Sequence, residues 1–148
     1  MKAQKILFPT DFSPASQEAL KWATSLARES GATLLIVHVE EPPMAYGGGE
    51  LYLGVDETNR QELRKALAQV VPTDPNVPYE HKLLVGDPAT SIVDLAESEG
   101  VDFIVLGSHG RTGLTRLLMG SVAEAVVRKA KCPVLTVKQP DKSGTSAS

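Results

Sequence analysis

The sequence predicts an α/β domain built on one sheet of parallel strands. Five short apolar runs alternate with amphipathic segments, as expected when helices connect parallel strands. Runs such as LLIV and FIVL are continuously apolar, which is typical of strands covered on both faces. A chain of 148 residues, 42% of them hydrophobic, is long enough for one domain with a buried core. The predicted strands span residues 5–9, 33–39, 79–85, 102–107 and 133–138.

Capping residues mark the ends of the predicted helices. The first helix is expected to begin after Ser13 and to end at Gly31, and the third to begin after Asp87 and to end at Gly100. The fourth is expected to begin at Ser121, in a capping box completed by the glutamate three residues later. Apolar spacing predicts the core-facing positions, among them Trp22 in the first helix, Leu63 to Val71 in the second, and Val122, Val126 and Val127 in the fourth.

Two segments fall outside this pattern. Residues 40–55, EEPPMAYGGGELYLGV, hold two prolines and four glycines and are predicted to form a long mobile loop, which is either functional, as a lid or a partner contact, or merely tolerated. Residues 141–148, DKSGTSAS, are predicted to be a disordered tail. We therefore expect one domain over residues 1–140.

Charge and cysteine content exclude several classes of protein. With 15 Lys and Arg against 18 Asp and Glu, the net charge is -3 and there is no basic stripe for nucleic acid. No apolar run approaches the ~18 residues of a membrane span, and the apolar N-terminal stretch is too short for a signal peptide. The single cysteine, Cys132, cannot form an intramolecular disulfide and suits a reducing compartment. The prediction is a cytoplasmic protein.

The stretch GSHGRTGLTRLLMGS, residues 107–121, is a candidate phosphate-binding segment. Its glycines let backbone N–H groups converge on an anion, and the predicted helix start at Ser121 supplies free N–H groups and a partial positive charge. Arg111 adds a cation at the rim. Alternatively, Gly107 and Gly110 form only a strand-ending turn and Ser121 is only a helix cap.

The motifs of several nucleotide-binding families are missing from the chain. No glycine is followed by lysine, which excludes a P-loop, and the first strand is followed by PTDFS rather than by G-x-G-x-x-G. Asp11 follows that first strand, where it lines a ligand site or helps to cap the first helix. We expect His38 to point to the core and His81 to be exposed, and neither has a partner at metal-ligand spacing.

Four motifs together resemble the universal stress protein family, specifically its ATP-binding branch. They are the spacing Gly107-x2-Gly110-x9-Gly120-Ser121, the opening KILFPTDFSPAS, the strand ending VHV and the closing CPVLTVK. The resemblance covers residues 3–138. It implies a three-layer sandwich in which helices cover both faces of a five-stranded parallel sheet of order 3-2-1-4-5.

The resemblance also implies a ligand and its site. The ligand is ATP, or else ADP or AMP, and any Mg²⁺ or Mn²⁺ is held largely by the phosphates. Adenine lies against the backbone near Val39, and the ribose and phosphates are wrapped by glycine-rich segments. The implied nucleotide-binding residues are Pro9, Thr10, Asp11, Val39, Gly107, Ser108, His109, Gly110, Arg111, Gly120, Ser121, Val122 and Ala123.

Binding explains these features better than catalysis does. The leading hypothesis is a regulatory ATP-binding module of the stress response, with no catalytic residue and no metal site of its own. One alternative is slow ATP hydrolysis with His109 or Asp11 orienting water. Another is a receiver-type signalling domain, which is weakened because Asp11 lacks an acidic neighbour. The family resemblance also implies a homodimer that pairs through the strand Pro133 to Lys138.

Overall fold

The computed structural model describes residues 3–42, 57–108 and 120–138. The predicted loop at 40–55 and the predicted tail at 141–148 lie largely or wholly outside these residues. Within the described ranges the elements are, in order, β1 (Lys5–Pro9), α1 (Pro14–Ser30), β2 (Thr33–Glu40), α2 (Glu57–Ala68), β3 (Tyr79–Val85), α3 (Pro88–Glu99), β4 (Phe103–Gly107), α4 (Ser121–Lys129) and β5 (Val134–Val137).

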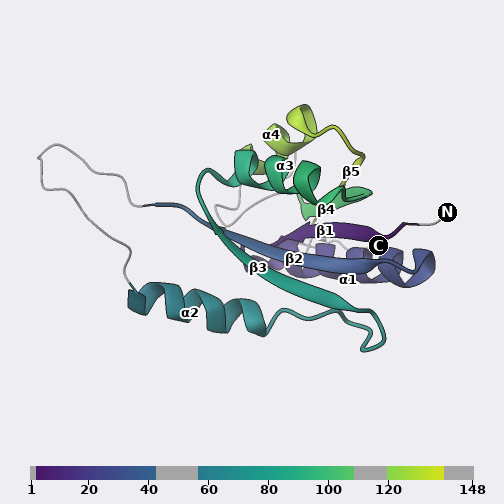
Figure 1. Cartoon of the computed structure of the whole chain (residues 1–148), viewed down its shortest axis with the longest axis horizontal. Coiled ribbons are helices and arrows are strands. Elements are labelled where there is room, and N and C mark those ends of the chain that lie inside the picture. The colour runs from purple at the N-terminus through teal and green to yellow at the C-terminus, as the bar shows by residue number, and fades with distance from the viewer. Residues whose placement is uncertain (1–2, 43–56, 109–119, 139–148) are drawn as a thin grey trace, which may run out of the picture.

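The strands form one parallel sheet of order β3-β2-β1-β4-β5, which confirms the predicted fold. Ile6 of β1 is in register with Leu34 of β2 on one side and with Phe103 of β4 on the other. Figure 1 shows α1 and α2 on one face of the sheet and α3 and α4 on the other. The molecule is therefore a three-layer α/β sandwich.

The core has two halves, one on each face of the sheet. Successive residues of a strand point to opposite faces, so Ile6 and Phe8 of β1 pack toward α1 while Leu7 packs toward α3 and α4. All three side chains are fully buried. The continuous apolar strands predicted this double burial.

The caps of α1 and α3 form as predicted. Ser13 accepts a hydrogen bond from the Ser16 N–H at the start of α1, and Asp87 does the same for α3. Each helix ends at a glycine in the left-handed conformation, Gly31 with φ 77° and Gly100 with φ 62°.

α4 begins at Ser121, as predicted, but its cap differs from the prediction. The N-cap is Gly120, which has no side chain to accept a hydrogen bond, and Ser121 is already the first helical residue. The capping box is therefore wrong, because a hydroxyl inside the helix is one position too late to cap it. The buried face of α4 is also rotated from the predicted one, since Ala123 and Val126 are buried while Val122 and Val127 are exposed.

Trp22 is not a core residue, as its side chain is 53% exposed. The stripe that α1 buries consists of four alanines at intervals of four residues, Ala15, Ala19, Ala23 and Ala27. Small side chains let a helix lie close to a sheet, and Trp22 lies beside that stripe.

The second helix is shorter than the apolar spacing predicted. α2 ends at Ala68, before Val70 and Val71, which were expected on its buried face. Among the residues described, no helix is long and apolar enough to cross a membrane.

Candidate functional site

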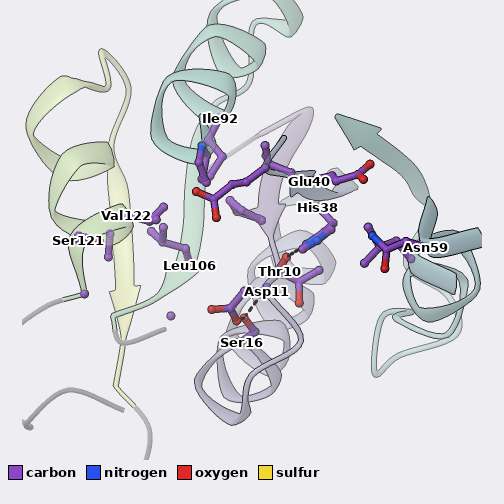
Figure 2. A pocket seen from close by; sticks show the side chains of 18 residues that line it. Thr10, Asp11, Ser16, His38, Glu40, Asn59, Ile92, Leu106, Ser121 and Val122 are labelled. Atoms are coloured by element: carbon purple, nitrogen blue, oxygen red, sulfur yellow. Dashed lines mark hydrogen bonds between the residues drawn. The ribbon is translucent and has the colours of Figure 1, made fainter. Parts of the chain in front are cut away.

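A cavity of about 710 Å³ opens at the carboxyl ends of β1, β2 and β4 (Figure 2). This is the end of an open parallel sheet where ligands bind, and β1 lies where the order of the strands reverses. The described residues that line the cavity are Pro9, Thr10, Asp11, Ser16, His38, Val39, Glu40, Glu41, Asn59, Leu63, Pro88, Ile92, Leu106, Gly107, Gly120, Ser121, Val122 and Ala123.

The turn between β1 and α1 forms the floor of the cavity. The Oδ1 atom of Asp11 accepts hydrogen bonds from the Ser13 N–H at 3.0 Å and from the Ser16 hydroxyl at 2.8 Å. Phe12 follows with φ 66°, an uncommon backbone conformation for a side chain of this size. Asp11 therefore helps to hold the capped start of α1, while Ser13 is the residue that caps the helix. The same hydrogen bonds fix the Asp11 carboxylate at the floor of the cavity.

The N-termini of α1 and α4 offer different environments to an anion. At α1 the Asp11 carboxylate already meets the positive end of the helix, so a phosphate there would be repelled. At α4 the cap Gly120 makes no side-chain hydrogen bond, and its first residues line the cavity. As far as the described residues show, the cap thus leaves the first N–H groups of α4 available to a ligand.

At the start of α3, too, a carboxylate already lies at the positive end of the helix. The Asp87 carboxylate accepts from the Thr90 N–H at 3.0 Å, and this hydrogen bond holds the pKa of Asp87 below its usual value. The carboxylate thus stays charged and occupies the N-terminus of α3. Of the helix starts for which the structure describes a cap, α4 is the open one at the cavity.

The end of β4 connects the cavity to α4. The Ser108 carbonyl accepts a hydrogen bond from the Gly120 N–H at 2.6 Å, and the Ser108 N–H donates to the Val137 carbonyl at 2.9 Å. These bonds fix the start of α4 against β4 and β5. Ser108 is buried and is not among the described residues that line the cavity, so its predicted contact with a ligand stays a prediction.

The end of β2 forms the side of the cavity away from α4. Val39 is buried at this wall, as expected for an apolar slot. His38 was expected to point to the core, but it is half-buried and lines the cavity, with Nδ1 2.8 Å from the Thr10 carbonyl oxygen. Because a carbonyl only accepts, Nδ1 carries the proton that forms this bond. His81, expected to be exposed, is half-buried, with Nε2 2.7 Å from the Val70 carbonyl oxygen.

The predicted site residues converge only in part within the described structure. Nine of them line the cavity: Pro9, Thr10, Asp11, Val39, Gly107, Gly120, Ser121, Val122 and Ala123. His109, Gly110 and Arg111 lie outside the described residues. Their roles stay predictions.

Sequence reasoning missed a whole wall of the cavity. Asn59 and Leu63 reach it from α2, and Glu40 and Glu41 from the end of β2. No local pattern marks Asn59, because the segment before α2 has no periodicity that would position the helix. The lysine or arginine that a phosphate site often uses is absent from the described lining, so there the backbone of α4 is the source of positive potential. The described residues also contain no group of three or more His, Cys, Asp or Glu side chains arranged to hold a metal.

The family is established by comparison with known proteins. A model of the universal stress protein family matches residues 2–138. The chain belongs to this family. It is similar to the universal stress protein MJ0531 of Methanocaldococcus jannaschii, with 40% identity over 146 aligned residues that cover 94% of this chain and 84% of the relative.

Two solved structures of universal stress proteins contain nucleotides. The universal stress protein from Archaeoglobus fulgidus in complex with dAMP is 26% identical, has a TM-score of 0.62, and is matched over 93% of this chain and 100% of the other. A universal stress protein in complex with cAMP is also 26% identical with a TM-score of 0.62, over 95% of this chain and 100% of the other. Similar folds in this family thus bind adenine nucleotides.

Proposed function

We propose that this universal stress protein binds an adenine nucleotide, with ATP as the principal ligand, and uses it as a regulatory ligand in the stress response of the cytoplasm. The observation that carries the proposal is the open N-terminus of α4. Its cap, Gly120, leaves the first N–H groups of the helix without a side-chain partner, and Ser121, Val122 and Ala123 line the cavity beside it.

The two sides of the cavity suit the two ends of a nucleotide. In Figure 2, Ser121 and Val122 lie on one side and Asn59 on the other, with Thr10 and Asp11 between them. Phosphates bind at the α4 side, and the nucleoside binds toward Val39 at the end of β2. A volume of about 710 Å³ is in the range of small-molecule sites.

The remaining predicted residues complete this arrangement in the proposal. Pro9, Thr10 and Asp11 face the ribose and base, and Gly107 to Arg111 wrap the phosphates from the β4 side. ADP and AMP bind to the same groups with fewer phosphate contacts. A Mg²⁺ or Mn²⁺ ion accompanies the nucleotide through its phosphate oxygens and water. We propose binding rather than hydrolysis as the role, since the positive potential that the described residues provide for phosphate comes from the backbone of α4.

A substitution at the start of α4 tests the proposal. Ser121→Glu places a carboxylate at the first helical position, where it favours the helix but repels phosphate. We expect the variant to keep its melting temperature and to bind ATP at least about tenfold more weakly in calorimetric titration. Its affinity for uncharged adenosine should change much less.

The matched control is Thr90→Glu. It adds the same charge to the first turn of α3, at an exposed position that does not line the cavity. This variant should bind ATP like the unmodified protein. Equal ATP affinity of Ser121→Glu and the control would refute the phosphate site at α4, and no ATP binding by the unmodified protein would refute the function.

We also propose that the protein is a homodimer paired through β5. This strand is at one edge of the sheet, and Leu135 on it is 38% exposed. An apolar edge strand with unpaired backbone groups is a ready partner for a second copy of itself.

A further inference from the structure

The first turns of α2 form a wall of the nucleotide cavity. Asn59 and Leu63, one turn apart, both line it, and Asn59 lies on the side away from Ser121 (Figure 2). Glu40, the last residue of β2, and Glu41, which follows it, also line the cavity. If phosphates bind at α4, this wall faces the nucleoside end of the ligand.

An ion pair connects that wall to the sheet. The Nε atom of Arg60 lies 3.1 Å from Oε1 of Glu40, the last residue of β2. The two side chains are only 20% and 11% exposed, so water screens the pair much less than it screens a pair on the open surface. The pair therefore joins the start of α2 to the strand end that supports the cavity.

Hydrophobic packing holds α2 at a different place. Among the described side chains of the helix, Leu67 is the buried one, and it lies two turns beyond Arg60. Most of the other described positions of α2 are exposed. The packing of Leu67 thus anchors the second half of the helix, while the pair of Arg60 and Glu40 fixes the half that lines the cavity.

We propose that Arg60 is a positioning residue for the nucleotide: its ion pair with Glu40 holds the first turns of α2 as a closed wall against the nucleoside. The inference rests on the proposed function and adds to it a residue that touches no phosphate. Without the pair, Asn59 and Leu63 are no longer held at the cavity, and the nucleoside loses one of its walls.

A second effect of the pair must be separated from the first. Arg60 also neutralises the Glu40 carboxylate, which would otherwise repel an anionic ligand. A charge effect weakens the binding of ATP but leaves that of neutral adenosine unchanged. A lost wall weakens both ligands by the same factor, since both contain the nucleoside.

The experiment compares Arg60→Gln with Arg60→Lys and with a control, Arg64→Gln. Arg64 is exposed, lies one turn further along α2 and does not line the cavity. We expect Arg60→Gln to weaken ATP and adenosine alike, by about tenfold. Arg60→Lys keeps a cation, and the ion pair in the structure is made through a single nitrogen. The affinities of Arg60→Lys and of Arg64→Gln for both ligands should therefore stay within about threefold of those of the unmodified protein.

Hydrogen exchange provides a measurement without nucleotide. The amides of residues 57–63 should exchange faster in Arg60→Gln than in the control, while those of β1 exchange equally. Equal exchange in the two variants, unchanged affinity of Arg60→Gln, or weakening of ATP alone would each overturn the inference. In the first case the pair does not hold α2, and in the others the wall does not bind nucleoside. The proposed function would survive all three, because it fails only if the unmodified protein binds no ATP.

Discussion

At the scale of single residues, Gly107 shows a steric requirement that the sequence did not reveal. A Cβ atom at this position would lie 2.9 Å from the carbonyl carbon of Ala15 and 3.0 Å from its Cβ. The absence of a side chain thus lets the end of β4 approach the first turn of α1. Gly107 was predicted to contact phosphate. The close packing of α1 on the sheet is by itself a sufficient reason for a glycine at this position.

Gly107→Ala should therefore destabilise the fold even without a ligand. The added methyl group meets backbone atoms of Ala15, which cannot move without shifting α1. We expect the free energy of unfolding to fall by about 1–3 kcal/mol, measured by urea denaturation of nucleotide-free protein. An unchanged midpoint with weaker ATP binding would instead mean that the glycine serves only the ligand.

At the scale of elements, Asp102 joins the start of β4 to the start of β1. Its Oδ2 atom accepts hydrogen bonds from the Gln4 N–H at 2.7 Å and from the Lys5 N–H at 3.0 Å, while its own N–H donates to the Lys5 carbonyl. The two backbone donors, first that of Lys5 and then that of Gln4, lower the pKa of the Asp102 carboxyl. The charged form is therefore the one that favours the folded state.

This coupling predicts a dependence of stability on pH. The pKa of Asp102 is lower in the folded than in the unfolded chain. Its contribution to the free energy of unfolding is therefore fully present at a pH above the pKa of the unfolded chain, and it is lost as the pH falls through the pKa of the folded chain. Asp102→Asn keeps an acceptor but cannot titrate. When the pH is lowered from about 6 to about 2, the Asp102→Asn variant should lose less free energy of unfolding than the unmodified protein. Thermal melts across this range test the difference, and parallel curves would contradict it.

At the scale of the whole molecule, the order of the strands creates both the site and the exposed edges. With β1 between β2 and β4, segments far apart in the sequence meet at one end of the sheet (Figure 1). Among the described strands, the same order leaves β3 and β5 with a neighbour on one side only. Leu135 on β5 and Tyr79 on β3 are exposed at 38% and 44%.

The proposed dimer predicts that these two edges respond differently to a charge. Leu135→Lys should convert the protein to a monomer, because a lysine on an edge strand opposes pairing with a second copy. Tyr79→Lys, the matched change at the other edge, should leave a dimer. Light scattering at micromolar concentration measures both masses. A monomeric unmodified protein, or a dimer in both variants, would exclude pairing through β5.

Local chemistry made much of the fold predictable from the sequence. Helix caps act within one helical turn, so sequence spacing alone placed the N-caps Ser13 and Asp87 and the C-caps Gly31 and Gly100. The positions of the strands followed from burial on both faces. By contrast, Trp22 is exposed because the depth of α1 on the sheet is set by its alanine stripe, which hydrophobicity alone does not reveal.

The sequence by itself determined the alternation of strands and helices and the family motifs at the ends of β1 and β4. These are properties of neighbouring residues, and they persist wherever the segment is placed. Only the tertiary structure decided that the start of α4 lies at the cavity beside the ends of β1 and β2, and that Arg60 of α2 pairs with Glu40 of β2. Both depend on how elements pack, because packing brings together residues that are far apart in the chain and carry no local signal.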